Sequence, residues 1–293
     1  MKKVVIAGGT GFIGSYLANR FRELGTAVVL ISHQPGHMSW HPADLENACD
    51  GADLVINLAG KTINCRHNEI NRQAILKSRV DTTMWIGNAL LACHKPPKLW
   101  INASASAIYR PSVDQPMTEF ETDLATGFLA EVVSKWESVF FGFNLQGTRQ
   151  VALRTSVVLG ENGGALSRLI WLSRFGLGGK LADGTQMMSW IHVEDYFRIV
   201  LFLSESLYLR GAVNCTTPCP VSNQEFMLAL RKALHVPIGI PAPKWAVSLG
   251  ASILGTEPEL ILNSSYLLPQ RLLDAGYHFA FPEIDKALTD ILK

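Results

Sequence analysis

Three glycines at intervals of three residues, set between an apolar run and a helical pattern, restrict the fold of this chain more than any other feature. Residues 4–7, Val-Val-Ile-Ala, are an unbroken apolar run that predicts a strand buried on both faces. Gly8, Gly11 and Gly14 follow at once, and apolar residues then recur at helical spacing up to Gly25. This pattern predicts a helix over residues 12–24. A strand, a glycine turn and a helix form the first unit of a parallel α/β sheet.

The three glycines have separate physical roles in such a turn. The first permits the tight turn, the second lets backbone approach a phosphate, and the third lets the helix pack on the strand. Backbone N–H groups at the start of the helix favour an anion. The motif therefore predicts that a dinucleotide cofactor binds here, with contacts from Gly8, Thr10, Gly11, Phe12, Ile13 and Gly14. A purely structural glycine turn is the alternative.

Strand and helix patterns continue to alternate along the chain. Strands are expected at residues 28–31, 54–58, 99–103 and 151–153, and helices at about 68–93 and 128–143. Two more short strands, at 190–193 and 212–215, follow a glycine-rich stretch, and a Ser222-x-x-Glu225 capping box opens a further helix. The alternation predicts a doubly wound parallel sheet. The proline-rich segment that follows is the best candidate for a linker, and we expect a nucleotide-binding domain over residues 1–236 and a small C-terminal α/β domain on the substrate side over residues 237–293.

Composition excludes several classes of partner. Of 293 residues, 48% are apolar and 17% charged, and 26 Lys and Arg balance 25 Asp and Glu without long blocks of one sign. Nothing marks a nucleic-acid groove or a membrane patch, and no apolar run is long enough to cross a bilayer. The five cysteines are odd in number and contain no CxxC pair, which favours a cytoplasmic protein with reduced thiols. No metal site is expected.

The residues at the end of the second strand favour NADP(H) over NAD(H). A carboxylate that grips the adenosine ribose belongs at this position, but Ser32 and His33 stand there instead. A hydroxyl and an imidazole can both donate hydrogen bonds to a 2′-phosphate. The alternative is that Ser32 and His33 are ordinary turn residues.

Several motifs in one order give the chain a recognisable signature. They are Gly9 to Gly14, Asn57 to Gly60, Ser78-Arg79, Trp136-Glu137, Arg154-Thr155 with Val158 to Gly160, and Ser189 to Asp195. Together they resemble the atypical short-chain dehydrogenase/reductases of the "epimerase family protein" subgroup. The likeness covers essentially the whole chain, and the last fifty residues resemble the C-terminal domain of unknown function attached to that subgroup.

The resemblance implies a Rossmann domain of the extended type, with a C-terminal part closing over a cleft for a small-molecule substrate. It implies that Leu58, Ala59 and Gly60 line the adenosine and ribose region and that Arg79 reaches the cofactor. In each case a plain turn or a solvated helix residue is the alternative. A dimer contact through two helices is common in the superfamily, which makes a homodimer an expectation of the same kind.

The proton-transfer pair of the superfamily is missing. Typical members use a Tyr-x-x-x-Lys pair, but no tyrosine here is followed by lysine four residues later, and Leu129 and Val133 occupy the corresponding positions. Ser104, Ser106 and Tyr109 follow the strand at 99–103, at the sheet edge where such folds place their chemistry, and are the catalytic candidates. Their alternative roles are to cap a turn and to pack. Further on, Glu194 or Asp195 is expected to cap the helix that runs to Leu203.

Two functions remain open. One is an NADP(H)-binding oxidoreductase or nucleotide-sugar epimerase-like enzyme of unknown substrate. The other is a non-catalytic NADP-binding regulatory protein that kept the nucleotide site and lost the proton-transfer pair.

Overall fold

A six-stranded parallel sheet forms the centre of the molecule in the computed structural model, which describes residues 1–161 and 163–293. Its strand order is β2-β1-β3-β4-β5-β9, and every neighbouring pair is parallel. The strands are β1 (Lys3–Ala7), β2 (Ala27–Ile31), β3 (Leu54–Asn57), β4 (Leu99–Ala105), β5 (Arg149–Thr155) and β9 (Gly211–Cys215). Because all six run in one direction, their carboxyl ends form a single edge, where ligands of such sheets bind.

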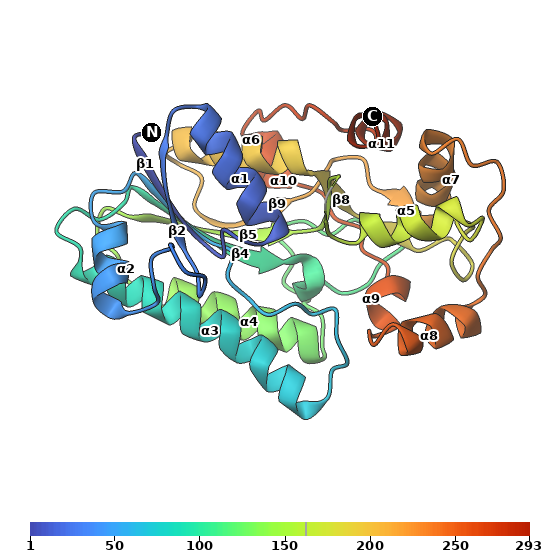
Figure 1. Ribbon diagram of the computed structural model, residues 1–293, viewed down its shortest axis with the longest axis horizontal. Coiled ribbons are helices and arrows are strands. Elements are labelled where there is room, and N and C mark those ends of the chain that lie inside the picture. The colour runs from blue at the N-terminus through green and yellow to red at the C-terminus, as the bar shows by residue number, and fades with distance from the viewer. Residues whose placement is uncertain (162) are drawn as a thin grey trace.

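Helices cover both faces of this sheet (Figure 1). Alternate residues of β1 explain why: Val4 and Ile6 pack into a core with α1 and α6, whereas Val5 and Ala7 pack into a second core with α2, α3 and α4. The helices are α1 (Phe12–Glu23), α2 (Pro42–Cys49), α3 (Glu69–Ala92), α4 (Phe128–Phe141) and α6 (Val193–Glu205). The predicted doubly wound sheet is therefore confirmed.

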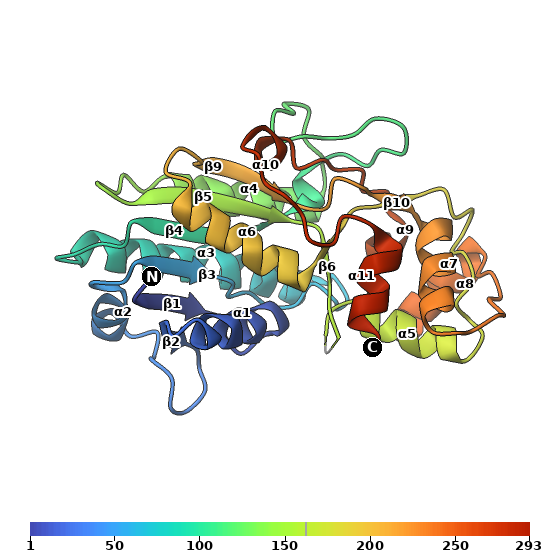
Figure 2. The ribbon, with the colours of Figure 1, turned by 90° about the horizontal axis from the view of Figure 1, so that it is seen from above.

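A second lobe lies beyond the carboxyl edge of the sheet, as seen from above in Figure 2. Trp190, Phe226 and Leu288 are buried in its core. The lobe contains β6 (Val157–Leu159), α5 (Leu166–Arg174), β7 (Met187–Met188), β8 (Trp190–His192), β10 (Val221–Ser222), α7 (Asn223–Ala233), α8 (Lys244–Ile253), α9 (Glu259–Leu262) and α11 (Ile284–Ile291). Two further short helices, η1 (Ser106–Ile108) and α10 (Gln270–Asp274), lie beside the sheet strands β4 and β9.

Local sequence signals account well for these elements. The predicted capping box is present, because Ser222 Oγ accepts from the N–H of Glu225 at 3.2 Å and Glu225 Oε2 accepts from the N–H of Ser222 at 2.8 Å. The short helix α2 was not predicted, although it begins at Pro42, a residue that suits the first turn of a helix.

The predicted division at residue 236 stays a prediction. Helix α7 lies before it and α11 after it, yet both contribute to one hydrophobic cluster. After residue 236 the regular elements of the described chain are helices, and the short strands β7 and β10 that pair in this lobe come from earlier segments. No helix of the described residues is long and apolar enough to span a membrane.

Candidate nucleotide site and sheet-edge cluster

The glycine turn is shaped by close backbone approaches at its first and third glycines. Gly8 has φ of +76°, and a Cβ there would lie 2.8 Å from the backbone nitrogen of Ala59. A Cβ on Gly14 would lie 2.4 Å from the carbonyl oxygen of Gly8. By contrast, a Cβ on Gly11 would first meet an atom at 3.5 Å. The first and third glycines are thus required by packing, while Gly11 leaves space open at the start of α1.

The amino end of α1 has the properties of an anion site. Its N-cap is Gly11, which has no side chain to accept from the first turn, and that turn contains no acidic residue. The first backbone N–H groups of any helix lack intrahelical acceptors and carry a partial positive charge. The glycine turn therefore leads into a helix end whose properties suit an anion. That Gly8, Thr10, Gly11, Ile13 and Gly14 contact a cofactor there stays a prediction.

Phe12 has a different role from its neighbours in the motif. A Cβ on Gly160 would lie 2.7 Å from the Phe12 ring, and a Cβ on Gly163 would lie 2.5 Å from it. The ring therefore packs against the glycine-rich loop that follows β6. At the start of α1, Phe12 therefore contributes only its backbone. Its side chain connects α1 to the second lobe.

The loop after β3 lies directly beside the glycine turn. That Leu58, Ala59 and Gly60 line the adenosine and ribose region stays a prediction. The N–H of Ala59 donates to Oδ1 of the buried Asn57 at 3.1 Å. A Cβ on Gly60 would lie 3.3 Å from Cζ of Arg79, so the loop passes close over that guanidinium.

Arg79 is a half-buried cation rather than a solvated helix residue. Its Nη1 donates to the carbonyl oxygens of Lys61 at 3.0 Å and Ile75 at 3.1 Å, and its Cζ lies 5.2 Å from the centre of the Trp136 ring. Among the described residues no carboxylate forms an ion pair with it. Burial lowers the pKa of Arg79 to about 10. A cation without a carboxylate partner is a suitable partner for an anionic ligand.

Ser32 and His33 lie at the end of β2, in the order predicted. Ser32 is 9% exposed, and its Oγ accepts from the N–H of Gln34 at 3.0 Å and lies 2.8 Å from Nδ1 of His37. His33 is exposed, and its ring centre lies 6.0 Å from that of Trp40. His37 is not among the cofactor residues expected from the sequence. Its contact with Ser32 depends on how the loop folds back. Among the described residues no cluster of His, Cys, Asp or Glu fits a metal ion.

Ser104 and Tyr109 belong to a buried network that we call the sheet-edge cluster, which comprises Ser104, Tyr109, Glu137, Arg154 and Asn214. Ser104 Oγ donates to Glu137 Oε1 at 2.6 Å, and Arg154 Nε and Nη2 donate to the two oxygens of Glu137 at 2.9 and 2.8 Å. Glu137 and Arg154 are both 8% exposed. The proton of the Ser104 hydroxyl is therefore already directed at a carboxylate.

The phenol of Tyr109 is held in the same cluster. It accepts from Arg154 Nη1 at 2.8 Å and donates to Asn214 Oδ1 at 2.8 Å. Burial raises the pKa of Tyr109 above its ordinary value, and the Arg154 charge only partly opposes this. A proton-transfer role would need a lowered pKa. Ser106, at the start of η1, is half-buried, and its hydroxyl makes no hydrogen bond among the residues that the structure describes. The catalytic roles of Ser104, Ser106 and Tyr109 stay predictions.

The positions of the missing Tyr-x-x-x-Lys pair lie next to this cluster. Val133 is 3% exposed and packs with Ile108, Tyr109 and Met117, while Leu129 is half-buried. Lys135 is exposed and lines a surface hollow between α3 and α4 with Lys77 and Asp81. No lysine of α4 therefore points toward the sheet edge.

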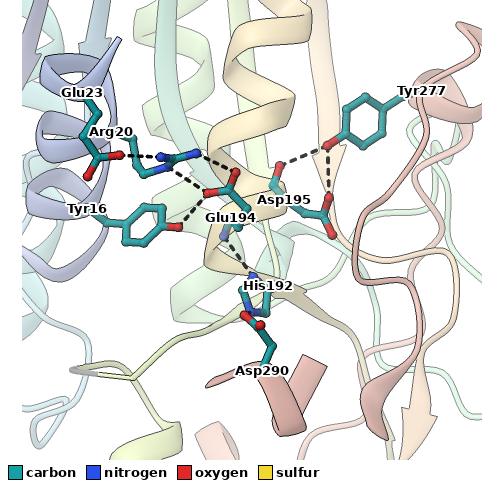
Figure 3. A network of polar contacts seen from close by, with 8 residues as sticks. All are labelled: Tyr16, Arg20, Glu23, His192, Glu194, Asp195, Tyr277 and Asp290. Atoms are coloured by element: carbon teal, nitrogen blue, oxygen red, sulfur yellow. Dashed lines mark hydrogen bonds and ion pairs between the residues drawn. The ribbon is translucent and has the colours of Figure 1, made fainter. Parts of the chain in front are cut away.

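The expectation that Glu194 or Asp195 caps α6 is wrong. The N-cap is His192, whose Nδ1 accepts from the N–H of Glu194 at 3.1 Å. The two acids instead point in opposite directions (Figure 3). Glu194 accepts hydrogen bonds from Arg20 Nε and Nη2, both at 3.0 Å, and from the Tyr16 hydroxyl at 2.7 Å. It therefore connects α6 to α1.

Asp195 ties α6 to the C-terminal segment. It is fully buried and accepts from the N–H groups of Ala280 and Phe281, each at 2.8 Å. Unsatisfied N–H groups would be costly at this depth, so the carboxylate fixes where the C-terminal segment crosses α6. The start of α6 thus connects α1 to the C-terminal segment. The sequence reveals the paired acids but not their partners.

Comparisons with known proteins agree with this architecture. The model of the NAD dependent epimerase/dehydratase family matches residues 4–214, and a domain of unknown function matches residues 242–291. The mouse epimerase family protein SDR39U1 is 36% identical over 301 residues, covering 99% of each chain.

Solved structures show the same fold. The crystal structure of human epimerase family protein SDR39U1 with NADPH superposes with a TM-score of 0.89 at 32% identity, covering 99% of both chains. The UDP-N-acetylglucosamine 4-epimerase of Bacillus cereus, at 16% identity and a TM-score of 0.80, shares the fold. The glycine turn, the parallel sheet and the matched family model together show that this chain belongs to the NAD-dependent epimerase/dehydratase family.

Proposed function

We propose that the protein binds NADP(H) along the carboxyl edge of the sheet and acts as an oxidoreductase or nucleotide-sugar epimerase-like enzyme on a small molecule. One observation carries the nucleotide site: the amino end of α1 has neither a capping side chain nor an acid in its first turn, and Gly11 leaves the space in front of it open. Such an end favours a pyrophosphate.

The preference for the phosphorylated cofactor is supported by the end of β2. Ser32 and His33 are donors, and no carboxylate forms an ion pair or hydrogen bond with either in the described chain. The human relative of known structure holds NADPH. Arg79, which forms no ion pair with a carboxylate among the described residues, adds a positive charge beside the loop that follows β3.

The roles of this chain's own residues follow from their contacts. The backbone of the glycine turn would hold the pyrophosphate, and Leu58 and Ala59 would pack beside the adenosine. The nicotinamide, when bound, supplies the hydride chemistry. Ser106 is the catalytic candidate whose hydroxyl makes no hydrogen bond within the described part of the chain, so it would orient the substrate oxygen. Tyr109 could pass a proton only by exchanging its bond to Asn214.

A second function, non-catalytic NADP binding with a regulatory role, is favoured by a different observation. Ser104 and Tyr109 both direct their protons to acceptors inside the sheet-edge cluster, and Leu129 and Val133 cannot move a proton. Binding of the nucleotide to such a protein would change its conformation or its binding partner, and carbonyl compounds would stay unreduced.

Nucleotide binding is tested by titrating the protein with NADPH and NADH while following nicotinamide fluorescence. Gly11→Asp places a carboxylate where the phosphates bind and should weaken NADPH at least about 100-fold, equivalent to about 2.7 kcal/mol. Gly250→Asp adds the same charge on α8, where a Cβ meets no atom within 4 Å, and should bind like the wild type. Equal binding by all three proteins would refute the proposed site.

Catalysis is tested separately by NADPH oxidation over a panel of carbonyl compounds and nucleotide sugars. Turnover that falls in Ser106→Ala supports the enzyme. If Tyr109→Phe keeps full turnover, Tyr109 has no role in the mechanism. Binding of NADPH without any oxidation above the rate of the free cofactor would favour the regulatory protein.

A further inference from the structure

The end of the second lobe farthest from the sheet is formed by two segments, one that follows α5 and one between α7 and α8 (Figure 1 and Figure 2). The N–H of Ile240 donates to the carbonyl oxygen of Gly176 at 2.8 Å, and the N–H of Ala182 donates to that of Ala242 at 2.8 Å. A Cβ on Gly179 would lie 2.4 Å from the carbonyl carbon of Ile240, so the two backbones are in close contact. The two segments therefore lie side by side at one end of the lobe.

Large apolar side chains are exposed on this end of the lobe, which we call the distal face. Six of them, each between 46% and 71% exposed, define it: Trp171, Phe175, Leu177, Ile238, Ile240 and Trp245. The rings of Trp171 and Phe175 lie against each other at the end of α5, with centres 4.9 Å apart. Single exposed apolar side chains are ordinary, but several together mark a surface that another molecule covers.

The distal face carries positive charge without negative charge. Residues 163–182 and 236–256 contain no acidic residue and four basic ones, Arg168, Arg174, Lys180 and Lys244. From α7, Arg231 lies beneath the face, because its Nη1 donates to the carbonyl oxygen of Pro237 at 3.0 Å and a Cβ on Gly239 would lie 2.4 Å from its Nε. Among the described residues none of these cations forms an ion pair.

The carboxylates that follow the two segments already have partners. Asp183 accepts from the N–H and the hydroxyl of Thr185, both at 3.0 Å, and Glu257 accepts from the N–H of His67 at 2.7 Å. Composition predicts no membrane patch because the four cations are spread over residues 168–244 and form no basic block. Only the fold brings them to one end of the molecule, beside exposed tryptophans.

We propose that the distal face docks the protein on the surface of an anionic lipid bilayer, without spanning it. Tryptophan and phenylalanine suit the boundary between headgroups and acyl chains, and anionic lipids attract each nearby Lys or Arg. A symmetric pair of copies joined through this face would bring like charges together, which opposes such a dimer. The glycine turn lies at the sheet, away from this end of the lobe, so docking should leave NADPH binding unchanged (Figure 1).

The charges are tested by flotation of the purified protein with two kinds of vesicle, phosphatidylcholine alone and phosphatidylcholine mixed with phosphatidylserine. The wild type should float with the mixed vesicles only, and raised salt should release it because screening weakens the attraction. Arg174→Gln/Lys244→Gln should bind the mixed vesicles more weakly, by about fivefold for each charge removed. Lys95→Gln, which removes an exposed charge after the end of α3, is the matched control and should bind like the wild type.

The apolar contacts are tested by Trp171→Ser/Trp245→Ser. This double variant should bind the mixed vesicles at least about tenfold more weakly, because both indoles would otherwise enter the interface. Its melting temperature should stay that of the wild type, since both side chains are exposed. Leu207→Ser removes an apolar side chain that is 79% exposed after the end of α6, and should float like the wild type.

The position of the bilayer is tested with acyl chains that carry bromine, which quenches tryptophan fluorescence at short range. Mixed vesicles of this kind should quench the wild type. Trp171→Phe/Trp245→Phe keeps aromatic rings on the face, and should still float while most of the quenching is lost. This variant separates contact of the distal face with lipid from a general loss of folding.

Three results would overturn the inference: no flotation of the wild type with either vesicle, equal flotation with both, or equal flotation of the wild type and both face variants. A dimer that light scattering detects and Trp171→Ser/Trp245→Ser abolishes would assign the face to a second copy instead. Flotation of a wild type that does not bind NADPH would support the distal face and count only against the proposed nucleotide site.

Discussion

The glycine turn and the sheet-edge cluster lie along one edge of the same sheet, yet they differ in whether their hydrogen-bond donors already have acceptors within the fold. At the turn, the first N–H groups of α1 and the Arg79 guanidinium have no anionic partner among the described residues. In the cluster, Ser104 and Tyr109 each donate to an acceptor within the fold, and Glu137 is bound by Arg154. Open donors are characteristic of a binding site, whereas satisfied donors stabilise a fold.

The contrast suggests that side chains at the sheet edge can be replaced while the backbone groups of the glycine turn stay in place. In families that use a tyrosine and lysine for proton transfer, the sheet edge must keep reactive groups available. Here that edge contains a buried ion pair beside apolar Val133. The proposed nucleotide site can persist without the proton-transfer pair because most of its proposed binding groups are backbone N–H groups, which do not depend on the identity of distant side chains.

The largest effect should come from breaking the ion pair of the cluster. Glu137→Ala leaves Arg154 buried without a carboxylate and Ser104 without its acceptor, and should cost about 3–5 kcal/mol of unfolding free energy. Glu194→Ala breaks a more exposed ion pair, in which Arg20 also donates two hydrogen bonds to one carboxylate. This change should cost about 1 kcal/mol of unfolding free energy. Urea unfolding measures both, and equal losses would contradict the cluster's role in stability.

A second test compares two glycines of the turn. Gly14→Ala forces a Cβ to within 2.4 Å of the Gly8 carbonyl oxygen, and overpacking against backbone should cost up to about 3 kcal/mol. Gly11→Ala meets no atom closer than 3.5 Å and should change stability by less than about 0.5 kcal/mol. Thermal unfolding of the two variants distinguishes them. Similar melting temperatures would show that the turn relaxes around Gly14.

The phenol of Tyr109 provides a third test. Tyr109→Phe leaves Arg154 Nη1 and Asn214 Oδ1 each short of a partner, which should cost about 1–2 kcal/mol without changing NADPH affinity. Tyr208→Phe, at a position 65% exposed, is the matched control and should have no effect. Weaker NADPH binding in Tyr109→Phe would place this phenol at the cofactor rather than in the structural cluster.

The smallest effect is the pH dependence of the unfolding free energy that comes from His192, the N-cap of α6. Burial lowers the pKa of His192, with Asp290, Asp195 and Glu194 partly opposing it. As the pH falls, His192 therefore takes up a proton in the unfolded chain at a higher pH than in the folded protein. The stabilisation from neutral His192 is complete above about pH 6.5. Below that pH the free energy of unfolding should fall by at most about 1.4 kcal/mol per pH unit.

His192→Asn isolates this contribution to pH dependence. Asparagine keeps an acceptor for the N–H of Glu194 but does not titrate. Denaturant unfolding from about pH 7.5 down to pH 5 should therefore give a flatter profile for the variant, through the range in which histidine titrates. Parallel profiles would show that His192 takes up its proton at the same pH in the folded and the unfolded chain, with Asp290 offsetting the effect of burial.

Much of the fold was predictable because its signals are local. The buried run 4–7, the glycine spacing and the helical pattern after Phe12 lie within one stretch of sequence, and the structure confirms each of them. The capping box at Ser222 was predictable for the same reason. Helix α2 was missed because eight residues give a weak periodic signal.

The sequence by itself determined the parallel α/β architecture and the position of the glycine turn, since each depends on residues close together in the chain. It also indicated the family, since each of the family's motifs is short and their order along the chain can be read directly. Only the tertiary structure decided the state of the candidate catalytic residues. Ser104 meets Glu137 across 33 residues and Tyr109 meets Arg154 across 45, and Asp195 meets Phe281 across 86. No local pattern records such pairings, because they depend on where separate strands and helices end once the sheet has formed.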